Sequence, residues 1–88
     1  MNHEFWNEIG NLYFMCGAYE PAIHAYLHSI KLDSTFGRSY SNLAMAYVQT
    51  GEYQDAINLY RRSIELLSDE KEKAATWNKL GILYRQQV

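Results

Sequence analysis

The sequence of 88 residues has one cysteine, one proline, no long apolar run and no surplus of positive charge. The single thiol, Cys16, cannot form a disulfide within the chain, so a disulfide framework is excluded and a reducing, cytoplasmic setting is expected. No apolar stretch approaches the roughly 20 residues that span a bilayer, so a membrane is not an expected partner. The formal net charge of −2 provides no broad basic field, so nucleic acid is not expected either.

Aromatic residues are abundant where turn-forming residues are scarce. The chain has eight tyrosines but only five glycines. This composition favours helices packed through rings over long loops or disorder. A chain of this length makes one small domain, which buries only about 60–65% of its unfolded surface.

An internal repeat runs through most of the chain. GAYEPAI at 17–23 returns as GEYQDAI at 51–57, and aligning residues 3–36 with 37–70 gives ten identities at a spacing of 34 residues. A period of this length is typical of a solenoid built from helix pairs. The identities are Tyr13/Tyr47, Gly17/Gly51, Tyr19/Tyr53, Ala22/Ala56, Ile23/Ile57, Tyr26/Tyr60, Ser29/Ser63, Ile30/Ile64, Leu32/Leu66 and Ser34/Ser68.

The hydrophobic period within each repeat predicts two helices. Trp6, Ile9 and Tyr13 recur at a spacing of three and four residues, and Gly17 follows where a helix needs a left-handed residue to end. Pro21 stands near the start of the next run, where its missing N–H is harmless. Extended along the chain, this pattern predicts helices at 3–16, 19–32, 37–50, 53–67 and 71–86.

Three copies of one motif resemble the tetratricopeptide repeat family. Residues 77–84 match its pattern W-x-x-L-G-x-x-Y without a change, residues 6–13 have Ile for Leu, and residues 40–47 are a softer copy. The chain departs from the family where Ser34 and Ser68 replace the usual Pro, and where three extra residues precede the third copy. The resemblance implies an all-α, antiparallel helix-hairpin solenoid with a right-handed superhelix. Its expected units are 3–36, 37–70 and a lone first helix at 71–88, as in a piece of a longer array.

The recurring small and aromatic residues are interpreted as scaffolding. Gly10, Ala44 and Gly81 allow the first helix of a unit to lie close to the second, where Ala22 and Ala56 are the small counterparts. We therefore expect a set of packing residues comprising Tyr13, Ala22, Tyr26, Tyr47, Ala56 and Tyr60.

A second stripe on the first helix of each unit is not explained by packing. In proteins of this family, that helix lines a concave surface that holds a peptide, and Asn side chains on it offer both a donor and an acceptor to a peptide backbone. Asn is a poor helix former, which makes its recurrence on one face informative. The expected peptide-binding residues are Asn7, Asn11, Arg38, Asn42, Met45, Asn78, Lys79 and Arg85.

Other kinds of site find little support in the sequence. Some family members hold a C-terminal carboxylate with two Lys, two Asn and one Arg. Here Asn11 and Asn42 stand at the Asn places and Lys79 at the Arg place, but Asn7 and Ala75 stand at the two Lys places, so such a clamp is incomplete. His24 and His28 provide two imidazoles where a structural zinc site uses four ligands. No Ser/His/Asp or Cys/His spacing indicates catalysis, so we expect no catalytic residue, metal or cofactor.

Two functions remain open at this point. The first is a non-enzymatic scaffold that binds a protein or peptide in the concave groove. The alternative is a structural element that self-associates into a homo-oligomer through an exposed apolar strip on the unpaired last helix. The residues expected in that strip are Trp77, Leu80 and Tyr84.

Overall fold

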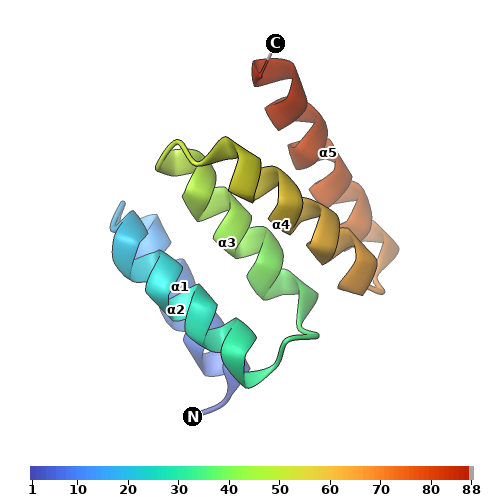
Figure 1. The fold of residues 1–88 in the computed structure, drawn as a ribbon. Helices are drawn as coiled ribbons and strands as arrows, with labels where there is room; N and C mark the ends of the chain where they lie inside the picture. The colour runs from blue at the N-terminus through green and yellow to red at the C-terminus, as the bar shows by residue number, and fades with distance from the viewer. Residues whose placement is uncertain (88) are drawn as a thin grey trace.

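Five α-helices follow one another in the computed structural model, which describes residues 1–87 (Figure 1). They are α1 (His3–Met15), α2 (Tyr19–Leu32), α3 (Gly37–Gln49), α4 (Tyr53–Leu66) and α5 (Glu70–Gln86). No β-strand occurs among these residues, and the expected all-α class is confirmed. Each helix end lies within one residue of its expected place. Residue 88, which the expected third unit includes, lies outside the described residues.

The two repeated glycines end α1 and α3 in the same way. Gly17 has a φ of +77° and Gly51 a φ of +85°, a backbone conformation that other residues rarely adopt. After each glycine, a backbone N–H turns back to a carbonyl of the last helical turn, from Ala18 to Tyr13 at 2.9 Å and from Glu52 to Tyr47 at 2.8 Å. This Schellman arrangement fixes the reversal between the two helices of each pair.

The three extra residues before the third motif lengthen α5. This helix has 17 residues, whereas α1 and α3 have 13 each. Asp69 caps its start, because its side chain accepts a hydrogen bond from the backbone N–H of Lys71 at 3.1 Å. The insertion therefore adds a helical turn ahead of Trp77 and leaves the motif itself intact.

Each complete pair, α1 with α2 and α3 with α4, packs through small residues and a tyrosine. A Cβ atom placed on Gly10 would lie 2.5 Å from the ring of Tyr26, so the ring occupies the space that a side chain at residue 10 would need. Ala22, Ala44 and Ala56 are completely buried, as expected for close helix crossings.

The core continues from one pair to the next. One cluster gathers Ala22, Tyr26 and Leu43, and the other gathers Tyr60, Leu80 and others, with Tyr47 and Leu59 packed against both. Of the six expected packing residues, five are buried or half-buried. Tyr13 is the exception, because its side chain remains 44% exposed at the edge of the α1–α2 contact.

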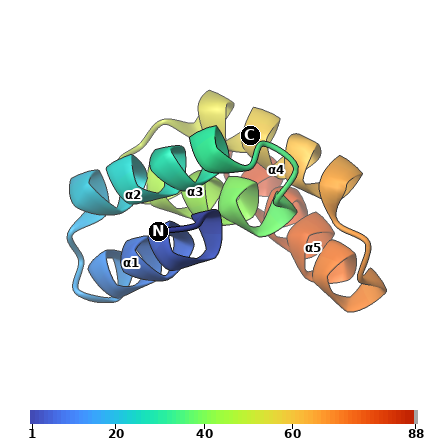
Figure 2. The same cartoon turned by 90° about the horizontal axis from the view of Figure 1, so that it is seen from below.

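The helices form two layers. Figure 2 shows α2 and α4 on one side of the molecule and α1, α3 and α5 on the other. Helix α3 lies in the middle and contacts α1, α2 and α4, whereas α1 and α5 lie at opposite ends (Figures 1 and 2). Within residues 1–87, no helix has both the length and the apolar character needed to cross a membrane.

Candidate binding surface

The expected binding residues lie on the layer formed by α1, α3 and α5, but they are not equally open to solvent. Asn7 is only 3% exposed. Its Oδ1 accepts hydrogen bonds from Ser39 Oγ and Asn42 Nδ2, both at 3.1 Å. Asn7 thus joins α1 to α3 from within, and this corrects the expectation that it offers an open amide to a ligand.

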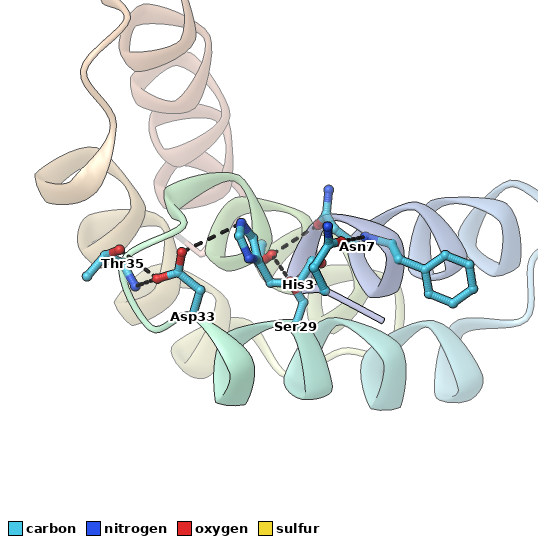
Figure 3. A network of polar contacts seen from close by, with 8 residues as sticks. His3, Asn7, Ser29, Asp33 and Thr35 are labelled. Carbon is cyan, nitrogen blue, oxygen red and sulfur yellow. Dashed lines mark hydrogen bonds and ion pairs between the residues drawn. The ribbon is translucent and has the colours of Figure 1, made fainter.

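A serine network supports the same junction (Figure 3). Ser29 Oγ donates to the backbone carbonyl of His3 at 2.7 Å and lies 2.7 Å from Ser39 Oγ. In the second pair, Ser63 Oγ donates to the carbonyl of Gly37 at 2.8 Å. Both serines therefore tie the second helix of a pair to the first residue of its own first helix. These contacts fix the spacing of the surface above them.

Sequence reasoning assigned no role to these serines. The sequence did hold a signal for two of them, because Ser29 and Ser63 occupy the same position of the repeat. A polar residue that recurs on a buried helix face needs a hydrogen-bond partner in each repeat. Ser39 had no such signal, because Phe5 stands 34 residues before it. Its partners become visible only when α1, α2 and α3 are placed together.

An exposed link at the turn between α2 and α3 extends this junction (Figure 3). Asp33 lies 3.6 Å from His3 Nε2 and accepts hydrogen bonds from the Thr35 hydroxyl at 2.6 Å and the Thr35 backbone N–H at 3.0 Å. These bonds from Thr35, followed by the nearby His3, lower the pKa of Asp33 below its usual value. The turn therefore keeps its carboxylate charged at neutral pH.

Asn11 and Asn42 lie at the rim of the junction, and one atom of each side-chain amide is already hydrogen-bonded within the chain. Asn11 Oδ1 accepts the hydroxyl of Tyr26 at 2.7 Å, and Asn42 donates its Nδ2 to Asn7. Burial, followed by the nearby Glu8 carboxylate, raises the pKa of Tyr26 to about 12, so this hydroxyl remains a donor at neutral pH. Asn11 is therefore left with an N–H donor and Asn42 with a carbonyl acceptor for other groups.

Two contacts join α3 to α5 across the same surface. Arg38 Nε lies 2.6 Å from a carboxylate oxygen of Glu72, and Lys79 Nζ lies 3.5 Å from Met45 Sδ. Arg38 was expected among the peptide-binding residues, and the structure places it against a carboxylate of the chain itself. Lys79 is exposed, so its charge remains accessible above Met45.

A hollow of about 160 Å³ lies beside Lys79 and is lined by Val48, Ile82 and Gln86 together with two core side chains. Its floor is apolar and its rim is polar. Asn78 and Arg85 are exposed on α5 nearby in sequence. At the other end, α1 carries Glu4 and Glu8, also exposed. The surface therefore changes from acidic at α1 to basic at α5.

The outer side of α5 differs from the expected apolar strip in one residue. Leu80 is 1% exposed because it packs into the core under α4, and its assignment to an exposed strip is wrong. Trp77 and Tyr84 are 58% and 37% exposed. Arg61 hydrogen-bonds the hydroxyl of Tyr84 and lies 5.6 Å from its ring centroid.

The histidines of α2 do not form a metal centre with other ligands. His28 lies against Trp6, with ring centroids 4.3 Å apart. In the part of the chain that the structure describes, no group of three or more His, Cys, Asp or Glu residues is placed to hold a metal ion.

Comparison with known proteins agrees with the repeat in the structure. A family model described as "Tetratricopeptide repeat" matches the chain twice, over residues 4–69 and 35–87. A search among curated proteins returned no match. The two overlapping matches cover nearly the whole chain and both include α3 and α4.

Proposed function

Because the chain belongs to the tetratricopeptide repeat family, whose members mediate protein–protein interactions, we propose that it binds a peptide segment along the layer of α1, α3 and α5. Repeats of this family are typically non-catalytic, and we propose a non-enzymatic role here. The observation that carries the proposal is the hollow between α3 and α5, with its apolar floor and with Lys79 and Gln86 at its rim.

The charges along the layer give the peptide a direction. An apolar side chain of the ligand would enter the hollow beside Val48 and Ile82, while acidic groups would lie near Lys79 and Arg85. Glu4 and Glu8 would repel the same acidic groups at the far end. Arg38 takes part as a support, because its pairing with Glu72 holds α3 beside α5.

The amides of Asn11 and Asn42 would meet the peptide backbone. Asn11 presents a donor and Asn42 an acceptor, because their other ends are held by Tyr26 and Asn7. This pre-organisation lowers the entropic cost of binding. Asn78 would add a third amide on α5, and Met45 an adaptable apolar contact.

The test uses a peptide selected from a random displayed library on the whole chain. Titration calorimetry of this peptide against Asn42→Ala should show a loss of roughly 1 kcal/mol or more, since one buried hydrogen bond is removed. The matched control is Asn58→Ala, an exposed asparagine of α4 in the other layer. Equal affinity for the Asn42 variant and the original chain would contradict the role of Asn42.

A second candidate function, self-association through α5, is favoured by the exposure of Trp77 and Tyr84. A hollow of about 360 Å³ lies beside them and is lined also by Arg61, Ile64 and Glu65 of α4. Exposed aromatic groups at a helix with one open side are frequent sites of association. Sedimentation across about a hundredfold range of concentration tests this, and a constant monomer mass would argue against it.

A further inference from the structure

Helix α1 has an apolar outer face to which neither proposed function assigns a role. Phe5 is 41% exposed and Leu12 60% exposed, and Cys16 is also exposed. A shallow hollow of about 300 Å³ lies here, lined by Ile9, Leu12, Tyr13 and Cys16. We call Phe5, Ile9, Leu12 and Cys16 the head face.

The repeat register places Phe5, Ile9 and Leu12 of the head face at positions that the other two first helices bury. Ile9 stands in the motif where α3 has Leu43 and α5 has Leu80, and each of these leucines is 1% exposed. Leu43 packs against α2 and Leu80 against α4. In the described chain, α1 has no helix before it, so Ile9 is only half-buried, and Phe5 and Leu12 are exposed.

The opposite end of the molecule carries a second open surface. Trp77, Gly81 and Tyr84 on α5, flanked by Lys73 and Arg85, form what we call the tail face. A Cβ atom on Gly81 would meet no atom within 4 Å, whereas the equivalent position in α1, Gly10, lies beneath Tyr26. The glycine therefore leaves room for a side chain from another molecule to lie close to the α5 backbone.

The borders of the two faces differ in charge: acidic at the head face, and mainly basic at the tail face, where Glu65 also lines the adjoining hollow and Lys73 pairs with Glu70. Helix α1 contains Glu4 and Glu8 but neither Lys nor Arg, whereas α5 contains four basic residues and two acidic ones. Glu8 is three residues from Phe5 and four from Leu12, so it lies beside the head face. Lys73 and Arg85 are each four residues from a member of the tail face, Trp77 and Gly81 respectively.

We infer that the head face of one copy docks on the tail face of another. The inference rests on the second candidate function, self-association through α5, and it names the opposing surface. Two tail faces placed together would bring Arg61, Lys73 and Arg85 near their own copies, whereas a head face brings Glu8 to these cations. The contact joins different surfaces of the two molecules, so it leaves one free face at each end and can continue into longer chains.

Two variants, each of which blocks one of the two faces, test this arrangement. Leu12→Glu places a charge on the head face, and Gly81→Glu places one on the tail face without a clash. Each variant should remain at the monomer mass of 10.3 kDa in sedimentation, while the original chain associates. An equal mixture of the two should form dimers and stop there, because it contains one intact head face and one intact tail face. Leu27→Glu, at an exposed leucine of α2, is the matched control and should associate like the original chain.

Cys16 gives a second readout, because it is the only thiol and lies on the head face. Under reducing conditions, its alkylation should slow at high protein concentration in the original chain but not in the Gly81→Glu variant. Circular dichroism melts check that both variants fold. If Leu12→Glu alone still dimerises, α5 pairs with itself, and the head-to-tail contact is overturned while self-association stands. If the original chain stays monomeric throughout, both are overturned.

Discussion

Gly10 and Gly81 occupy the same position of the repeated motif, but their surroundings differ. At Gly10 the ring of Tyr26 lies where a Cβ atom would be, at 2.5 Å, whereas at Gly81 no atom lies within 4 Å. The aromatic residue four positions earlier follows the same division. Trp6 is half-buried and contacts His28, whereas Trp77 is mostly exposed.

The difference shows that the motif encodes a contact between two helices. One side of α5 uses Leu80 and Leu83 to pack against the helix before it, and that side is fully buried. The other side carries Trp77 and Gly81, and the equivalent residues of α1, Trp6 and Gly10, contact the next helix, α2. A motif can therefore be complete in sequence while half of its contact surface is open in the folded chain.

High pH should have the largest effect, because it acts on the tyrosines that complete the two covered pairs. Burial raises the pKa of Tyr60 from 10.0 to about 12, and burial with the charge of Glu8 does the same for Tyr26. A raised tyrosine pKa contributes stability that is complete below the unfolded pKa of 10 and is lost as pH rises through about 12. Helicity followed by circular dichroism during an alkaline titration should fall in this window. In Tyr60→Phe, which cannot ionise at this position, the midpoint should move upward, and an unchanged midpoint would exclude Tyr60 as a cause.

Alanine at the two glycines should change stability in opposite directions. Gly10→Ala should lower the free energy of unfolding by roughly 1–3 kcal/mol, because the buried Tyr26 ring must shift away from its bond with Asn11. Gly81→Ala should raise it by about 0.5–1 kcal/mol, because alanine favours the helix and meets no neighbour. Urea unfolding of both variants measures the pair. A loss at Gly81 would mean that its open side is occupied in solution.

Alanine at the two repeated serines should destabilise the chain by a smaller amount, and slightly more at Ser29 of the first helix pair than at Ser63 of the second. Ser29→Ala should cost about 1–2 kcal/mol and Ser63→Ala about 1 kcal/mol, because each loses a bond to a backbone carbonyl and Ser29 also contacts Ser39. Thermal melts of the two variants and of the double variant test this. Equal losses would indicate that the Ser39 contact adds nothing to the first pair.

The positions of the helices were predictable because several local signals agree along the sequence. Hydrophobic period, repeated glycine and motif register all mark the same boundaries, and Gly17 and Gly51 end their helices as expected. The three extra residues before Trp77 could lengthen α4, the turn after it or α5, and the local sequence does not decide among these. The structure adds them to α5.

The candidate surface was less predictable, because exposure depends on contacts between helices. Asn7 and Asn11 lie four residues apart on one face of α1, yet Asn7 is buried by α3 and Asn11 reaches Tyr26 of α2. The pairing of Arg38 with Glu72 likewise joins residues 34 positions apart. The assignment of Leu80 to an exposed strip was wrong for the same reason. The motif predicts which residue stands at this position, but not which side of α5 is covered by α4.

The linear order of contacts has a consequence for how the chain unfolds. Each helix packs mainly against the helix before and the helix after it, and α5 packs mainly against α4 alone. In such an array, stability is close to a sum of terms for each unit and for each junction between neighbours. Amide hydrogen exchange should therefore be fastest in α5 and slowest in the middle helices, where α3 has neighbours on both sides. The molecule would then open in steps from its end, and a population with α5 detached and the first two pairs intact is accessible without global unfolding.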